Sequence, residues 1–195
     1  MMVFASLLLV SAPQAVDCRY DREHLIAMDQ RSFDQDLTGG WRALAAKGCD
    51  REAADLVRDW RVAHKAEDGI LYWHEGQLRA DAGDYAAAAP LFEKSRKPGT
   101  NGYDRAWNLY VDGSIAFVRG DRAGLEAVRA KLAAVPRPAD FQEEARGPDG
   151  KPILLPDGTP WRVQWPLNLD VLDGLLGCWG KPYAEAYGCR APSAS

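Results

Sequence analysis

Hydrophobic residues recur with helical spacing through the middle of the chain, from about residue 20 to residue 135. β-branched residues are sparse in this stretch, and apolar positions return every three or four residues, as the buried face of an amphipathic helix requires. We therefore expect a series of helices and a mainly α-helical fold. The one run that alternates between apolar and polar residues, a pattern typical of a strand, lies later, at Trp161–Trp165.

Three glycines divide the helical region into pairs of helices. Gly48, Gly83 and Gly120 each follow a predicted helix, and an aspartate one or two residues later begins the next. Glycine ends helices because it readily adopts a left-handed backbone, and an aspartate side chain accepts hydrogen bonds from the first amides of a helix. The glycines recur at intervals of 35 and 37 residues, a period typical of stacked helical hairpins. The expected capping residues are Asp50, Asp84 and Asp121.

The central unit resembles a tetratricopeptide repeat (TPR). The positions that carry the resemblance are Tyr72, Gly76, Gly83, Tyr85, Ala88 and Phe92, with Pro98 near the end of the unit. The flanking units are degenerate, since Val57 and Arg129 stand where the second-helix phenylalanine is expected, and Pro90 departs from the pattern inside a helix. The resemblance covers about residues 34–135 and implies an array of antiparallel helical hairpins. An ordinary helical bundle with chance glycine spacing is the alternative.

The start of the chain predicts export. Residues 1–15 carry no charge and contain the apolar run Val3–Val10, which is much shorter than the ~20 residues of a membrane-spanning helix. Such a run followed by small residues is typical of a secretory signal peptide, although no lysine or arginine precedes it here. A buried first helix or strand is the alternative. We expect a periplasmic or secreted protein after removal of this peptide, with residues 16–36 forming an N-terminal capping helix.

The cysteines support the same compartment. There are four, and no two show the CxxC spacing of zinc ribbons or redox motifs. Two disulfides in an oxidising compartment are expected, and we favour Cys18–Cys49 and Cys178–Cys189 because each ties a terminus to neighbouring structure. The other two pairings stay open, and four free thiols in a cytosolic protein are the alternative. We expect no metal site.

Residues 136–195 differ in composition from the helical region. Prolines punctuate this segment, and two Pro-Asp-Gly sequences are strong turn signals. We expect a small β-hairpin across Pro156–Thr159, which is too small to be stable alone and must lean on the helices. Short helices follow, and the whole segment is expected to pack on the same domain as the repeats of residues 37–135.

The sequence contains no recognisable catalytic constellation. No hydrolase elbow, P-loop or dinucleotide fingerprint occurs, and the three histidines have no companion at ligand spacing. His74-Glu75 begins like a zinc-protease signature, but Leu78 stands where its second histidine would be. We expect His24 and His64 to be solvated or packed helix residues, and acidic pairs such as Asp34 with Asp36 to lie on solvated helix faces. The net charge of −4 without basic runs disfavours a nucleic-acid partner. We therefore expect a protein without catalytic activity, cofactor or transmembrane segment.

The aromatic residues supply the candidate binding sites. The chain holds seven tryptophans, and large rings dominate binding hot spots, although rings at helical spacing belong more often to the core. The resemblance implies that the first helix of each unit lines a concave groove. Trp161 and Trp165 share one face of the predicted hairpin, where they either attach it to the helices or form a binding patch. The predicted groove residues are Trp73, Gln77, Trp107, Tyr110, Ser114 and Phe117.

These features favour an exported TPR-like protein that binds a protein or peptide partner in the cell envelope. One alternative is a secreted inhibitor or binder of a cell-wall enzyme that acts through the hairpin. Another is an envelope hydrolase that uses carboxylates. The groove is available to a peptide only if the C-terminal segment does not fill it, and the sequence does not decide this or the oligomeric state.

Overall fold

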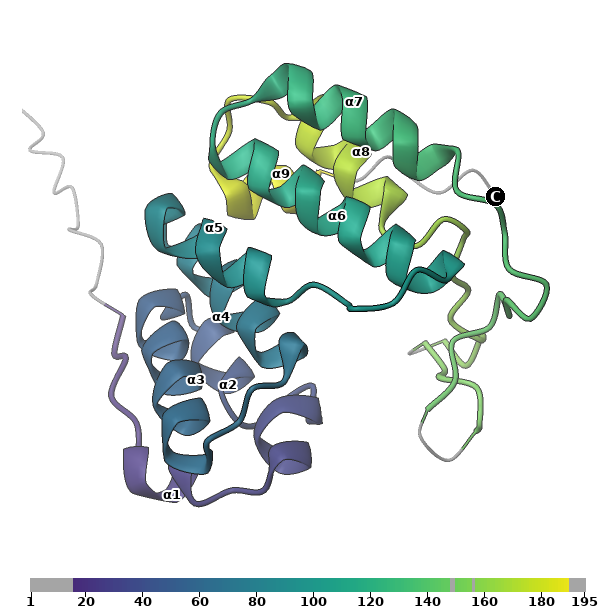
Figure 1. Ribbon diagram of the computed structural model, residues 1–195. Helices are drawn as coiled ribbons and strands as arrows, with labels where there is room; N and C mark the ends of the chain where they lie inside the picture. Colours follow the sequence, from purple (N-terminus) through teal and green to yellow (C-terminus); the bar gives the residue numbers. More distant parts are fainter. Residues whose placement is uncertain (1–15, 148–149, 156, 190–195) are drawn as a thin grey trace, which may run out of the picture.

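The chain folds into helices joined by short connections and one long loop. The computed structural model describes residues 16–147, 150–155 and 157–189, and the predicted signal peptide lies outside them. The described residues form nine α-helices, one π-helix and no strand, so the fold is mainly α-helical (Figure 1). The helices are α1 (Arg22–Ile26), η1 (Arg31–Gln35), α2 (Arg42–Ala45), α3 (Asp50–His64), α4 (Gly69–Asp81), α5 (Tyr85–Lys94), α6 (Gly102–Val118), α7 (Arg122–Ala133), α8 (Leu169–Gly177) and α9 (Tyr183–Gly188).

The three glycines occupy equivalent connections. Gly48, Gly83 and Gly120 lie between α2 and α3, between α4 and α5, and between α6 and α7, with φ angles of +79°, +77° and +71°. Glycine adopts this left-handed backbone without the steric cost of a Cβ. Each connection turns the chain back so that the two helices it joins pack against each other.

The predicted capping residues behave differently from one another. Asp84 and Asp121 cap α5 and α7, since each side chain accepts a hydrogen bond from the backbone N–H three residues later. Asp50 does not cap α3, because Cys49 holds the cap position and Asp50 is already the first helical residue. The exposed Pro90 lies inside α5, which continues past it to Lys94.

Helix α4 contributes to two hydrophobic clusters. Leu71 and Leu78 pack into one cluster with η1, α2 and α3, whereas Trp73 and Ala80 pack into the other with helices α5 to α9. Gly76 allows α5 to approach α4 closely, because a Cβ at this position would lie 2.8 Å from the ring of Phe92. The helix therefore joins the N-terminal and C-terminal parts of the core.

The N-terminal segment is not one continuous helix, as residues 16–36 were expected to be. Between α1 and η1, the carboxylate of Asp29 accepts hydrogen bonds from the backbone N–H and the hydroxyl of Ser32, at 3.1 and 2.8 Å. Side-chain bonds of this kind compete with helical backbone bonds and begin a new turn. Phe33 of η1 is fully buried against the helices that follow.

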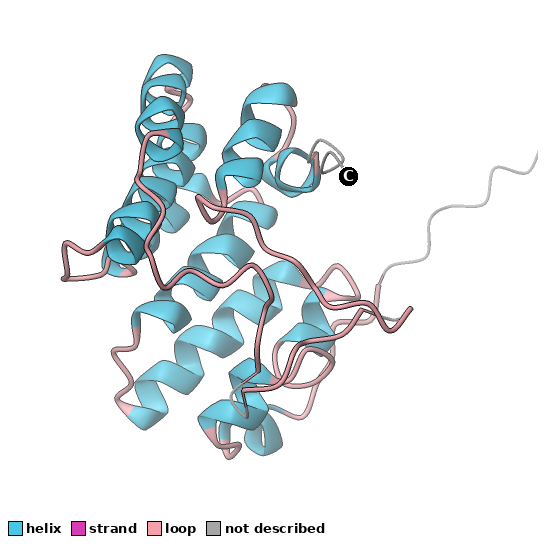
Figure 2. Ribbon diagram, turned by 90° about the vertical axis from the view of Figure 1, so that its right-hand side faces the viewer, coloured by secondary structure: helices cyan, strands magenta, loops and turns pink. Residues whose placement is uncertain are grey.

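The described residues within 141–165 form a loop with isolated backbone bridges, which we call the bridged loop, and not the expected β-hairpin. Pro152 and Pro160 each take part in a bridge but have no N–H to donate, so no bridge extends into a ladder. Figure 2 shows this segment as loop without strand. The expected turn is still present, because the N–H of Leu155 donates to the carbonyl of Thr159 at 2.8 Å; Pro156 itself lies outside the described residues. The bridges are Glu144–Arg162, Arg146–Pro152 and Leu154–Pro160.

The C-terminal helices return to the helical body. Helix α8 packs on α6 and α7, and α9 packs on α4 and α8. Leu172 and Leu175 of α8 are fully buried in the second cluster. Gly113 of α6 leaves room for α8, because a Cβ there would lie 2.6 Å from a methyl group of Leu172.

Candidate functional site

The predicted groove residues lie mostly in the core. Trp73, Tyr110, Ser114 and Phe117 are buried, and Gln77 and Trp107 are partly buried. The ring of Trp73 lies 5.0 Å from that of Trp107 and 4.7 Å from that of Tyr110 between centroids. The aromatic rings of Trp73, Trp107 and Tyr110 therefore contact one another, and they pack against other helices.

Helix α9 occupies the face on which the groove was expected. The fully buried ring of Tyr183 lies 5.8 Å from that of Phe117, and its hydroxyl lies beside Gln77 and Ser114. Burial raises the pKa of Tyr183 well above its ordinary value of 10.0, so the phenol stays neutral. The hydroxyl of Tyr110 donates to that of Tyr187 at 3.1 Å. Helix α9 thus contacts Gln77, Tyr110, Ser114 and Phe117 of the predicted groove.

The two tryptophans of the bridged loop have separate environments. The indole N–H of Trp165 donates to the carbonyl of Val135 at 2.9 Å, and its ring meets Tyr103 and Phe141 edge-on at 5.4 and 5.2 Å. Trp165 therefore attaches the loop to the end of α7 and the start of α6. Trp161, by contrast, is 47% exposed.

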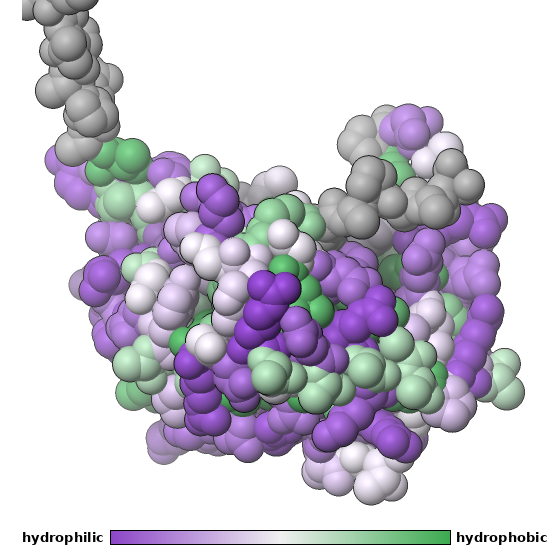
Figure 3. All heavy atoms as spheres, turned by 90° about the horizontal axis from the view of Figure 1, so that it is seen from above, coloured by the Kyte–Doolittle hydropathy of each residue, from purple (hydrophilic) through white to green (hydrophobic). Residues whose placement is uncertain are grey.

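Trp161 is one of three large hydrophobic residues that are exposed on this loop. Leu154 and Leu155 are 59% and 44% exposed, and the N–H of Trp161 donates to the carbonyl of Ile153 at 2.8 Å, which brings the two stretches together. We call Leu154, Leu155 and Trp161 the apolar tip. Figure 1 shows the loop projecting away from the helices. The face seen in Figure 3 instead interleaves hydrophilic residues with small hydrophobic areas.

The structure contains a buried polar cluster centred on Asp34, which the sequence does not predict. The carboxylate is fully buried, accepts a hydrogen bond from the indole N–H of Trp41 at 2.9 Å and lies 2.6 Å from Nδ1 of His74. Burial alone would raise the pKa of Asp34, but hydrogen bonds with His74, Trp41 and Gln35 outweigh it and hold the pKa below 3.8. The expectation of a solvated Asp34 is therefore wrong. No motif spacing links Asp34 to His74, so no sequence signal would have found the pair.

The arrangement around His74 ties elements together. A carboxylate that holds a histidine ring is also the arrangement that orients a general base. Here the ring of Trp41 lies 5.1 Å from that of His74, and the guanidinium of Arg42 stacks on Trp41 at 4.1 Å and donates to the carbonyl of Asp34. This packing joins η1 and α2 to α4 and supports a structural role.

A second group of buried polar contacts joins α3 to α4. The guanidinium of Arg61 donates to Glu75, and both side chains are buried. Arg61 also stacks on the ring of Tyr72 at 3.9 Å. Arg79 extends the network to Asp55 at 2.6 Å. These contacts fix the angle between two neighbouring helices.

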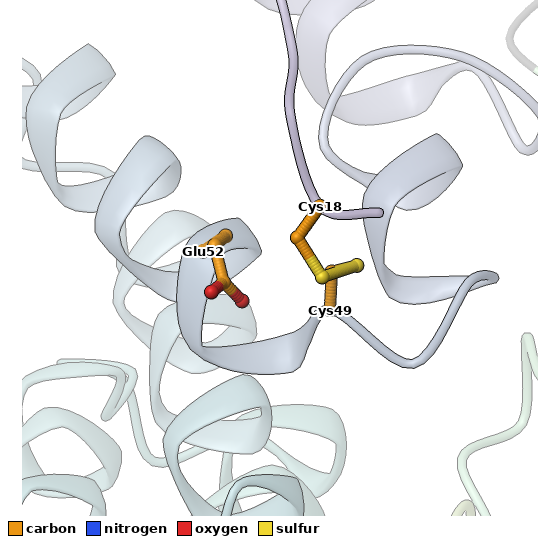
Figure 4. Close-up of side chains that lie close together, drawn as sticks. All are labelled: Cys18, Cys49 and Glu52. Carbon is orange, nitrogen blue, oxygen red and sulfur yellow. A yellow bond between two sulfur atoms is a disulfide. The ribbon is translucent and has the colours of Figure 1, made fainter. Parts of the chain in front are cut away.

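Both predicted disulfides are present, Cys18–Cys49 and Cys178–Cys189. Figure 4 shows Glu52 beside the first, with its carboxylate and the two sulfurs within 4.8 Å of one another. A metal ion requires deprotonated thiolates as ligands, and the sulfurs of a disulfide are not thiolates. This group is therefore a covalent staple with a neighbouring carboxylate.

Among the surface hollows of the described residues, two are similar in volume. One of about 420 Å³ lies between α5, α6 and α7, where Arg96 pairs with Glu93 at 2.8 Å and with Asp112 at 2.5 Å. The other, of about 460 Å³, lies at the base of the bridged loop beside Trp165. Neither borders the cluster around Asp34.

Comparison with known proteins leaves the family open. No protein-family model, curated protein or solved structure matches this chain. None of the helices in the described ranges combines the length and the apolar character that crossing a bilayer demands.

Proposed function

We propose that this chain is an exported binding protein without catalytic activity, whose TPR-like helical body presents the bridged loop to a protein partner. The observation that carries the proposal is the apolar tip. Three large hydrophobic side chains, Leu154, Leu155 and Trp161, are each exposed on the same loop, which projects from the helices (Figure 1). The other large exposed hydrophobic side chains of the described chain, Val16, Leu37 and Val62, belong to three separate segments.

Exposed apolar groups favour association because their burial removes hydrocarbon surface from water. Each square ångström buried contributes roughly 25 cal/mol, and rings such as that of Trp161 are common hot-spot residues. The prolines of the loop, including Pro152 and Pro160, restrict its backbone before any partner binds. A restricted loop loses less conformational entropy on binding than a flexible one.

The helical body supports the proposal as a scaffold. The TPR-like arrangement is consistent with three glycine connections of similar backbone angle and with packing between successive helices. Because Tyr183 of α9 packs beside Gln77 and Phe117, two of the predicted groove residues, we assign the docking surface to the loop. Two disulfides are typical of proteins that fold in an oxidising compartment, which supports export.

The proposal is tested by comparing protein capture from an envelope extract by matched variants. The tip variant combines Leu154→Ser with Trp161→Ala, and the control is Val62→Ser, which removes a side chain that is 70% exposed on α3. We expect the wild type and the control to retain the same partner, and the tip variant to retain at least tenfold less. Equal retention by all three proteins would remove the basis for this docking surface. Circular dichroism checks that the helices are unchanged.

A second candidate function is inhibition of a cell-wall enzyme, which the projecting shape of the loop favours. A convex apolar tip fits a hollow, and enzyme active sites are usually concave. We expect the wild type, but not the tip variant, to slow hydrolysis of purified cell wall by an envelope extract. Binding without any inhibition would leave the first candidate in place and reject the second.

A further inference from the structure

The cavity at the base of the bridged loop has the size of a small-molecule site. Its volume is about 460 Å³, within the range of roughly 300–1,000 Å³ that is usual for ligand pockets. It combines an aromatic ring and an aliphatic side chain with charged groups and one amide. The lining residues are Arg137, Glu143, Arg162, Val163, Gln164 and Trp165.

The charges in this cavity are not balanced. Glu143 lies between two cations, 2.9 Å from the guanidinium of Arg137 and 3.6 Å from that of Arg162. One carboxylate therefore faces two guanidinium groups, and the lining residues retain one excess positive charge. All three side chains are about half exposed or more, so these ion pairs are weak and readily exchanged.

The cavity wall is held in place before a ligand arrives. Trp165 is fixed by its bond to Val135 and by the edge-on contacts with Tyr103 and Phe141. The guanidinium of Arg137 lies 5.1 Å from the ring of Phe141, on its face. The N–H of Val163 donates to the carbonyl of Glu143 at 2.7 Å, which fixes the backbone on both sides of the cavity.

We propose that this cavity binds a small molecule in which a carboxylate lies next to a ring. Guanidinium groups bind carboxylates through paired N–H donors. The carboxylate of the ligand would therefore displace that of Glu143 and bind to Arg162 and Arg137. The ring would lie against Trp165 and Val163, and the amide of Gln164 would bond a polar substituent. Uronic sugars and aromatic acids share this chemistry. The apolar tip is not part of this site, so the two proposals stand separately.

The ligand class is tested by isothermal titration of the full chain at low salt with two acids and their neutral counterparts. The probes are glucuronate against glucose, and benzoate against benzyl alcohol. We expect at least one acid to bind saturably and its neutral counterpart to bind at least tenfold more weakly. If only glucuronate binds saturably, the ligand class is a sugar acid. If only benzoate binds saturably, the ligand class is an aromatic acid. Binding of neither acid, or equal binding of an acid and its neutral counterpart, overturns the proposal.

Three variants test the residues assigned to the site. Arg162→Gln should weaken binding of the acid at least tenfold, and Glu143→Gln should strengthen it because a competing carboxylate is removed. Arg146→Gln is the matched control, since this arginine lies on the same loop but does not line the cavity. An unchanged affinity in Arg162→Gln, or an equal loss in the control, contradicts the assignment.

Discussion

At the scale of single residues, two aspartates show how surroundings decide charge in this molecule. Asp34 is buried but ionised, because hydrogen bonds from its neighbours offset the loss of water. Asp81 is the last residue of α4, where the carbonyl end of the helix disfavours a negative charge. Its burial, together with the charge of Asp50, raises its pKa to about 7.

We predict that Asp81→Asn stabilises the protein in alkaline solution. The folded pKa of about 7 lies above the ordinary value of 3.8, so the folded state binds the proton more tightly than the unfolded state. The stability of the wild type therefore falls as the pH rises from about 4 to 7, and the full penalty applies above pH 7. Urea unfolding at pH 8 should show a gain of about 2–4 kcal/mol in the variant. The gain should be smaller at pH 5, and an equal gain at both pH values contradicts the assigned cause.

Asp34→Asn should destabilise the protein by about 2–4 kcal/mol at pH 7, because it removes a buried charge that its donors require. The control is Asp36→Asn, two residues away, where the side chain is exposed and accepts a bond from Thr38. We expect a change of less than about 1 kcal/mol there. Urea unfolding measures both. Similar losses in the two variants would mean that burial of Asp34 does not matter.

The sequence pattern does not separate these residues. Asp34 and Asp36 look alike along the chain, but His74 and Trp41 reach only Asp34. That difference depends on contacts between residues far apart in sequence, which local pattern does not encode.

At the scale of elements, local signals predict most of the helices. The connections at Gly83 and Gly120 follow from a glycine that ends one helix and an aspartate that caps the next, both within a few residues. The β-hairpin prediction is wrong. It rests on the turn signals, but Pro152 and Pro160 have no N–H groups to donate, so a ladder of hydrogen bonds does not form. The sequence pattern does not predict the break after α1, because that break depends on the side chain of Asp29.

Gly113→Ala should lower stability by about 1–3 kcal/mol, because the added methyl group meets Leu172 at 2.6 Å and forces α6 and α8 apart. Gly177→Ala, at the end of α8, is the control, since a Cβ there meets nothing within 4 Å. We expect the control to match or exceed the wild type by up to about 1 kcal/mol. Thermal and urea unfolding compare them, and equal behaviour of the two variants contradicts the proposed close approach.

The two disulfides should contribute unequally. Their cysteines lie 31 and 11 residues apart, and the longer loop loses more entropy in the unfolded chain when it is closed. Replacing Cys18 and Cys49 by serine should cost about 3–4 kcal/mol, and replacing Cys178 and Cys189 about 3 kcal/mol. Urea unfolding of the two double variants tests the order, and the reverse order would show that chain entropy does not dominate.

At the scale of the whole molecule, the N-terminal and C-terminal parts of the described core meet at α4. Opposite faces of α4 join the two hydrophobic clusters, and α9 closes the face that carries Trp73. The spacing of the predicted repeats identifies residues such as Trp73 and Tyr110 that lie close together in the structure. Whether they are accessible depends on α9, which lies about 100 residues later in the chain and donates a hydrogen bond to Tyr85. For this reason we propose the projecting loop, and not the helices, as the recognition surface.

The most direct test of this assignment is site-specific photo-crosslinking in an envelope extract. A photoreactive phenylalanine derivative is placed at Trp161 in the apolar tip, at Trp107 in the partly buried aromatic cluster, and at the exposed Val62 of α3. We predict one discrete crosslinked protein from position 161 and none from positions 107 and 62. A product from position 107 with none from position 161 would contradict the account and place recognition on the helical face.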